Sequence, residues 1–246
     1  MSDLQQRVNA LLEESQTLGE DKYISSFLPF IPIITIVLQI IILIVLSPSN
    51  TPYFRIVGLE KSFISFPILF ITYLIPLYLY YKWINGRNMH FNRVSKFYTL
   101  STEIIEIMKL ERAYIIKSRL NELTLDSNTK SVGVNIVLAA LIPFYFLYIY
   151  HFMNKDMIRH SEKERLLLIE MIDSIKNRDP YFTKSILDHH EIKDRSTFIY
   201  IILSIITLGF FSIYWAYAIT KDYNEHIRKD NLLTREINAS LKRLNS

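Results

Sequence analysis

Four apolar runs, almost free of charge, interrupt this chain of 246 residues. They are residues 27–46, 63–83, 132–153 and 198–219, and only Lys82, near the end of the second run, carries a full charge. A helix needs about 20 residues to cross a hydrocarbon core of about 30 Å, and each run has that length. A buried core helix can also be apolar on every face, but four of them would leave little of so short a chain to cover them. The runs therefore predict an all-α, polytopic membrane protein with about four transmembrane helices.

The polar stretches between the runs carry a helical pattern of their own. Apolar residues recur three and four positions apart, which is typical of amphipathic helices with a heptad-like seam. Such helices can lie on the lipid surface or form a bundle that projects from the membrane. The expected units are an amphipathic N-terminal helix (residues 1–26), a first transmembrane hairpin (27–83), a charged helical segment (84–131), a third membrane segment (132–153), a second charged helical segment (154–196), a fourth membrane segment (197–220) and a C-terminal amphipathic helix (221–246).

Charge predicts the orientation of these segments. The first 26 residues carry five acidic residues against Arg7 and Lys22, unlike the basic start of a cleavable signal peptide. With four crossings, the side that holds both termini carries 17 Lys and Arg, and the other side carries 11. The positive-inside rule then favours a multi-pass protein of the cell membrane with both termini in the cytoplasm and residues 47–62 outside.

Similar stretches recur at nearly equal spacing. They begin at Ile75-Pro76, Ile142-Pro143 and Leu208-Gly209, which places Pro76, Pro143 and Gly209 at intervals of 67 and 66 residues. In the same frame His160 falls on His226. Each copy consists of an apolar segment broken near its middle by Pro or Gly, an aromatic band and a long charged helix. This pattern predicts an internal repeat of about 66 residues.

The breaks allow two topologies. If every apolar segment spans the membrane, consecutive copies point in opposite directions. If the last two segments instead dip in and return, all the charged helices stay on one side, because a half-segment of about 11 residues, or about 17 Å of helix, reaches through one leaflet. One Pro or Gly is a short connection for a hairpin, whereas a kinked spanning helix needs only that. Four crossings are therefore the favoured expectation.

Aromatic bands close three of the apolar segments. They consist of Tyr78, Tyr80, Tyr81 and Trp83, then Tyr145, Tyr148 and Tyr150, then Tyr214, Trp215 and Tyr217. Tyr and Trp prefer the headgroup level, where the ring is apolar and its tip forms hydrogen bonds. The bands are expected to anchor the chain at the membrane surface, and an aromatic ligand groove is the alternative.

The last copy, Ile206 to Trp215, resembles a prokaryotic integral-membrane domain family of unknown function. The signature of that family is a Thr-x-Gly-x-Tyr-x-x-Tyr-Trp-like run after an apolar stretch, which Thr207, Gly209, Tyr214 and Trp215 match. Phe211 stands at the position of the first Tyr, and the earlier copies lack the Gly and the Trp. The resemblance covers about 25 residues. It implies a membrane protein and carries no activity with it.

The sequence offers little catalytic chemistry. There are no cysteines, which excludes disulfides, thiolate ligands and a Cys nucleophile. No phosphate-binding loop, zinc-protease motif, nucleophile elbow or dinucleotide fingerprint is present. His160 and Glu164 are four residues apart and can share a metal on one helix face, and His189-His190-Glu191 can bind a transition metal, but both patterns are more often solvated polar residues. We expect no enzyme and no catalytic, cofactor-binding or metal site.

The function is expected to rest on packing. The apolar runs hold no ionisable residue in their interiors, which speaks against an ion-coupled transporter. Positive and negative charges are interleaved, which speaks against nucleic-acid binding. We expect a non-enzymatic scaffold or accessory subunit in the lipid bilayer, either a homo-oligomer or part of a larger membrane complex. A membrane-shaping protein with re-entrant wedges and a small transporter or channel are the alternatives. The structural or interaction candidates are Pro76, Pro143, Gly209, Trp215, Ile237 and Leu241.

Overall fold

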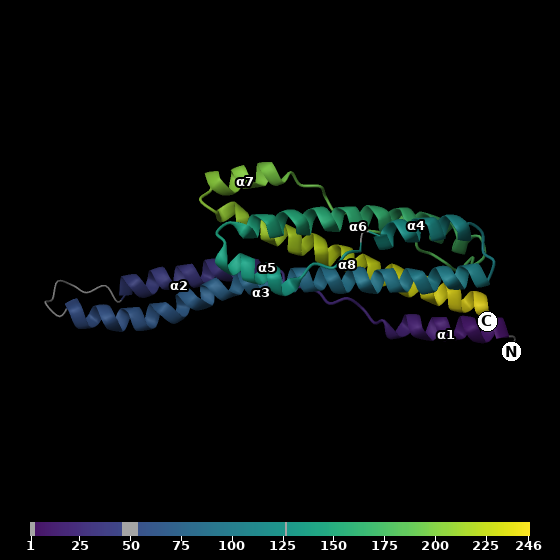
Figure 1. The fold of residues 1–246 in the computed structure, drawn as a ribbon, viewed down its shortest axis with the longest axis horizontal. Helices are drawn as coiled ribbons and strands as arrows, with labels where there is room; N and C mark the ends of the chain where they lie inside the picture. Colours follow the sequence, from purple (N-terminus) through teal and green to yellow (C-terminus); the bar gives the residue numbers. More distant parts are fainter. Residues whose placement is uncertain (1–2, 46–53, 126) are drawn as a thin grey trace.

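The computed structural model describes residues 3–45, 54–125 and 127–246, and every regular element in them is a helix. The elements are α1 (Asp3–Thr17), η1 (Leu28–Phe30), α2 (Ile31–Val45), α3 (Phe54–Ile107), α4 (Ala113–Leu125), α5 (Val132–Leu141), α6 (Tyr145–Lys176), η2 (Ile186–Asp188), α7 (Thr197–Ile206) and α8 (Phe210–Asn245). Figure 1 shows an elongated molecule, in which α2 and the first part of α3 project from one end and both termini lie at the other. The expected all-α class is confirmed.

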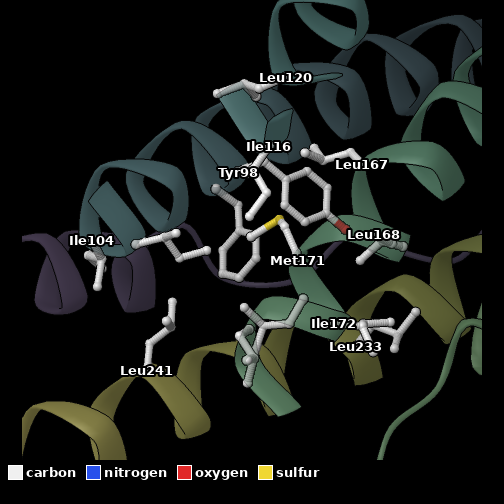
Figure 2. Packing of buried hydrophobic residues seen from close by; sticks show 14 of the residues in the cluster. Tyr98, Ile104, Ile116, Leu120, Leu167, Leu168, Met171, Ile172, Leu233 and Leu241 are labelled. Atoms are coloured by element: carbon white, nitrogen blue, oxygen red, sulfur yellow. The ribbon is translucent and has the colours of Figure 1, made fainter. Parts of the chain in front are cut away.

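A helical bundle forms the half of the molecule near the termini. It consists of α1, α4, α6, α8 and the second part of α3, whose apolar seams face one another. Figure 2 shows this core, to which α3 contributes Tyr98, α6 contributes Met171 and α8 contributes Leu233. The amphipathic stretches therefore form a bundle rather than lie separately on a surface.

The C-terminal seam is covered by this bundle. Ile237 and Leu241 are both 0% exposed in its core. The sequence made them structural or interaction candidates, and the helices that they contact in the structure belong to their own chain. Burying each such side chain contributes about 1.5–3 kcal/mol, so this seam stabilises the fold.

The N-terminal segment is attached to α8 by side-chain amides. Asn224 accepts a hydrogen bond from the backbone N–H of Ile24 at 2.9 Å and donates one to the carbonyl of the same residue at 2.7 Å. Gln5 donates to the carbonyl of Asn245 at 3.1 Å. These bonds satisfy extended backbone that would otherwise lose its water on packing.

The third and fourth apolar runs fold back on themselves. Ser131 and Ser196 cap α5 and α7, and the chain then reverses into α6 and α8 through left-handed residues, Phe144 (φ 64°) and Gly209 (φ 93°). The hydroxyl of Tyr145 reaches back to Asn135 at 2.9 Å. We call these two units the wedge hairpins (residues 131–156 and 196–222).

Besides the capping serine and the left-handed residue at the reversal, the two wedge hairpins share an ion pair at the base. Lys130 lies 3.9 Å from Asp156, and Arg195 forms an ion pair with Asp222. Both acids are at matching positions of the expected repeat. The first copy differs, because Pro76 lies inside the continuous helix α3 and no break occurs there.

This arrangement leaves the expected four transmembrane helices unconfirmed. In the described part of the chain, one helix, in α3 from Phe66 onward, is long and apolar enough to cross a membrane, judged by length and composition. Three further apolar helices are shorter, Leu28–Ile41, Val132–Leu141 and Thr197–Ile206. Four crossings would place residues 84–131 and 154–196 on opposite sides, yet α3, α4 and α6 pack in one bundle. At Pro143-Phe144 and at Gly209 the chain reverses into the next helix, where four crossings would need a kinked spanning helix. Of the expected loop at residues 47–62, residues 47–53 lie outside the described residues and residues 54–62 form the start of α3.

Candidate functional site

Exposed apolar side chains gather on α2, the first part of α3, α5 and α7, helices that lie away from the termini (Figure 1). On the projecting hairpin they are Ile34, Ile36, Val37, Leu38, Ile40 and Ile41 of α2 and Phe66, Phe70, Ile71, Tyr73 and Leu74 of α3. On the wedge hairpins they are Val134, Val137, Leu141, Ile142, Phe144, Phe198, Ile199, Ile202, Ile205, Ile206, Leu208 and Phe210. We call this surface the apolar end. Patches of this size on a folded protein mark a membrane or a partner.

The aromatic bands divide between the interior and the surface. Tyr80, Trp83, Tyr150 and Trp215 are buried and pack edge to face or tilted, with the rings of Tyr150 and Trp215 centred 5.0 Å apart. The indole of Trp83 donates to Thr220 at 3.0 Å. Tyr78, Tyr81, Tyr148 and Tyr214 are exposed and remain available to a headgroup layer. The expectation of a surface belt is therefore wrong for the four buried rings, because α3, α6 and α8 converge there.

A buried polar cluster lies beyond these aromatic rings, between α3, α6 and α8. Its members are Asp21, His90, Arg93, Tyr98, His160, Glu164, His226 and Asp230. Seven of them have 9% or less of their surface exposed, with His90, Glu164, His226 and Asp230 at 0%, and the side chain of Asp21 is 5% exposed. So many charged groups without water are costly unless they pair with one another or with an ion. We refer to these eight residues as the buried cluster.

Two histidines of the cluster have fixed orientations. Nδ1 of His90 lies 2.7 Å from the carboxylate of Asp21, and Nδ1 of His226 lies 3.1 Å from the carbonyl oxygen of His190. Both acceptors favour a proton on Nδ1. The two Nε2 atoms lie 3.1 Å apart, which is within hydrogen-bond distance.

The other two members on α6 have orphaned atoms. Nε2 of His160 is buried and has no hydrogen-bond partner, and its ring stacks on Phe91 at 4.0 Å. Glu164 accepts a hydrogen bond from Tyr98 through Oε1 at 3.0 Å. Its second oxygen, Oε2, receives no hydrogen bond although it lies 3.2 Å from Nε2 of His226. Buried polar atoms without partners are uncommon in folded proteins, so these two atoms need an explanation.

Arg93 organises the remaining carboxylates. Its Nε donates to Asp21 at 2.6 Å, and its Nη2 pairs with Asp230. The hydroxyl of Tyr98 adds a longer contact to Asp230, at 3.4 Å. One guanidinium therefore holds the N-terminal segment against α3 and α8.

Burial and charge shift the titration of these groups. Burial lowers the pKa of His90 and lowers that of His160 well below its ordinary value, which leaves both neutral near pH 7. Burial acts to raise the pKa of Glu164, but the neighbouring His226 outweighs it and holds that pKa well below the usual range. Burial and the charge of Glu164 raise the pKa of Asp230. Burial acts to lower the pKa of His226, yet Glu164 raises it overall.

The sequence indicated only part of this cluster. His160 and Glu164 do share a helix face, and they meet His90 and His226 from two other helices. The residues of the second sequence candidate, His189-His190-Glu191, do not share one site. His189 is buried beside the cluster, whereas Glu191 pairs with Arg165 at 2.8 Å near the surface.

A spacing that recurs in the sequence could have indicated the residues of the cluster that were missed. A His is followed four residues later by an acid in both long helices, at His160 and Glu164 and again at His226 and Asp230.

Comparison with known proteins is sparse. A family model described as a domain of unknown function (DUF4234) matches residues 195–241, which include α7 and most of α8. No curated protein and no solved structure matches the chain. The expected resemblance around Ile206 to Trp215 is supported in its coarse form, an uncharacterised domain in this stretch. The matched range contributes His226 and Asp230 to the buried cluster.

Proposed function

We propose that this chain is a non-enzymatic membrane scaffold or accessory subunit whose anchor enters the bilayer from one face. The observation that carries the proposal is the apolar end: its side chains are exposed, while the bundle buries side chains of the same kinds. Removing apolar surface from water is favourable by about 25 cal/mol per Å². A bilayer provides that removal for the whole surface at once.

The anchor has a deep part and a shallow part. The α2/α3 hairpin is the deep part. The wedge hairpins are shallow, because α5 and α7 contain 10 residues each, about 15 Å of helix, or half of a core of about 30 Å. At the tip of the second wedge hairpin, the N–H of Gly209 donates to the carbonyl of Ser204 at 2.7 Å, and that of Phe211 donates to Thr207 Oγ1 at 2.9 Å. Lipid requires such internal satisfaction of the backbone.

Charge supports the same arrangement. With both wedge hairpins returning to one side, all Lys and Arg except the two at residues 47–62 share that side, 26 of 28. The positive-inside rule assigns it to the cytoplasm, together with both termini. This separation is far stronger than the one that four crossings give.

Single cysteines test the topology, because the chain has none of its own. We would place them at Tyr114 (85% exposed), Tyr181 (75% exposed), Ser49 and Ser246, and label intact cells with a membrane-impermeant thiol reagent. We expect Ser49→Cys to react and the other three to stay protected until the cells are opened. Four crossings would instead expose Tyr181→Cys on the same side as Ser49→Cys, which would overturn the proposal.

The scaffold role also predicts stable association. Native mass spectrometry of gently solubilised protein should show a homo-oligomer or a complex with another membrane protein. Because Ile237 and Leu241 are buried within the chain, their substitution should act on the stability of the fold first. A species that is monomeric in every mild detergent and in nanodiscs would contradict the scaffold role.

Membrane shaping is a second candidate, favoured by the one-sided wedge hairpins. Leu208 is 90% exposed and Phe210 is 69% exposed, both at the tip of the second hairpin. Inserting such tips into one leaflet expands that leaflet relative to the other. Reconstituted protein should then reduce vesicle diameter in electron micrographs, and Leu208→Ser with Phe210→Ser should abolish the effect. Tyr181→Ser, on the bundle, is the matched control.

A further inference from the structure

Three imidazoles and one carboxylate converge inside the buried cluster. His90 from α3, His160 and Glu164 from α6, and His226 from α8 each offer one ligand atom, and these four atoms lie within 4.8 Å of one another. We propose that they bind a divalent first-row transition-metal ion, with Zn²⁺ as the best fit. Neutral imidazole and carboxylate are ligands that Zn²⁺ accepts in four-coordinate sites.

The hydrogen bonds of the two central histidines fit this assignment. A histidine that binds metal through one ring nitrogen donates its other N–H to a carboxylate or a backbone carbonyl. His90 has the carboxylate of Asp21 at 2.7 Å, and His226 has the carbonyl of His190 at 3.1 Å, in both cases on Nδ1. The supporting contacts of a metal site are therefore present for both rings.

The distances between ligand atoms have the right size. In a tetrahedral site with bonds of about 2.0–2.1 Å, neighbouring ligand atoms lie about 3.3 Å apart. Nε2 of His226 lies 3.1 Å from Nε2 of His90 and 3.2 Å from Oε2 of Glu164. With the protons on Nδ1, all three atoms are acceptors, which repel one another at this distance unless a proton or a metal cation lies between them. The fourth ligand, His160, has an unpartnered Nε2 and completes the set with a small movement of its side chain.

A neighbouring triad of possible ligands is already paired with a cationic side chain. Asp21, His90 and Asp230 also offer ligand atoms within 4.8 Å of one another. Arg93 already lies against both carboxylates of that triad. The guanidinium takes the place of an ion there, so the metal is assigned to the three-histidine group alone.

The ligand set is closed, with four protein ligands that are each 3% exposed or less. Zinc sites of this kind are structural, whereas catalytic sites keep a position open for water. The ion would join α3, α6 and α8 at one point and would contribute to folding.

The test measures metal in the full-length protein, purified in mild detergent through an affinity tag without histidines. Inductively coupled plasma mass spectrometry should find about one Zn²⁺ per chain. After chelation, reloading with Co²⁺ should give the visible absorption of tetrahedral coordination. Zn²⁺ at 100-fold above its Kd should raise the unfolding temperature by about 5–10 °C.

Two histidines on the same helix provide the matched variants. His160→Gln should lower the Zn²⁺ affinity more than 100-fold and remove the Co²⁺ spectrum. His151→Gln should change neither, because His151 is exposed and bonds to Thr197 at 2.7 Å. Asp21→Asn should weaken binding about 10–100-fold, as loss of a supporting hydrogen bond does.

Folding of each variant is checked by circular dichroism and gel filtration. A ligand variant that does not fold leaves the metal content and Co²⁺ spectrum of the wild-type protein as the deciding measurements. Folded wild-type protein that takes up no Zn²⁺ or Co²⁺ would overturn the assignment and leave the cluster as a proton-held network. Equal uptake by folded His160→Gln and wild type would overturn it as well.

Discussion

Two isoleucines on helices that adjoin each other in the sequence show how differently the two ends of this molecule are built. Ile206 ends α7 at 71% exposure, whereas Ile237 in α8 is fully buried. At the apolar end, side chains of this kind face outward and few charges are present. In the bundle they face inward, and charged groups are buried with them. The same repeat unit supplies both environments, because α6 and α8 each begin at a wedge hairpin and end in the bundle.

The contrast shows that hydrophobic periodicity alone does not reveal what covers an apolar residue. In the bundle, other helices of the chain cover the seams, so the fold itself gains the burial energy. At the apolar end, no other part of the described chain covers them, so the surroundings must. A substitution should therefore act on folding at one end and on membrane attachment at the other.

The largest expected effect comes from the buried charges. Arg93→Met keeps most of the volume but leaves the carboxylates of Asp21 and Asp230 without their cation, which should cost about 3–5 kcal/mol of unfolding free energy. Arg112→Met is the control, because Arg112 is 41% exposed where it pairs with Glu170 and Asp173. Exposed pairs contribute about 0–1 kcal/mol. Denaturant titration in mild detergent measures both, and equal losses would remove the distinction.

The second comparison uses one residue type at both ends. Ile237→Ala should cost about 2–5 kcal/mol, since it leaves a cavity in the bundle core. Ile206→Ala should change the unfolding free energy by less than about 0.5 kcal/mol in detergent. It should instead weaken lipid attachment of the second wedge hairpin, measured as reduced shielding of a label at Leu208→Cys from a water-soluble quencher. The reverse pattern would show that the apolar end folds against something other than lipid.

The smallest effect concerns two glycines. Gly209 has φ of 93° and nothing within 4 Å of the position that a Cβ would take, so Gly209→Ala should cost about 1–2 kcal/mol through backbone strain alone. Gly133, inside α5, is equally unobstructed and lacks the positive φ. Gly133→Ala should stabilise the protein by up to about 1 kcal/mol. Thermal unfolding of the two variants sharpens the contrast, and destabilisation by both would point to a steric cause.

Local signals in the sequence predicted the helical class, the amphipathic seams and the breaks at Pro143 and Gly209. Periodicity and the special backbone of Pro and Gly act within a few residues, so one sequence suffices for them. The reversal of the chain was not predictable in the same way, because Phe144 is not a glycine and its positive φ is imposed by the fold. Pro76 shows the opposite failure, since α3 continues through it.

The buried cluster depended on long-range packing. His90 lies 70 residues before His160 in the sequence, and no local pattern connects them. A lone histidine in a charged stretch is typical of a solvated helix face. Trp215 is similar: its place in an aromatic band indicated a surface, and only the convergence of three helices buries it. The doubled spacing of a histidine and an acid in α6 and α8 was the one feature that sequence could have used.

The contact between the two ends of the chain sets the order of events during synthesis. The partners Ile24 and Asn224 are 200 residues apart, and Gln5 and Asn245 are 240 apart. At a translation rate of about 5–20 residues per second, α1 waits for about 10–40 s before α8 exists. During that interval α1 has α3 but not α8 to pack against. Asp21 can already meet His90 and Arg93 of α3, but the buried cluster still lacks His226 and Asp230. Closure of the bundle is therefore the last step, and the ribosome must finish α8 before the buried cluster can be assembled.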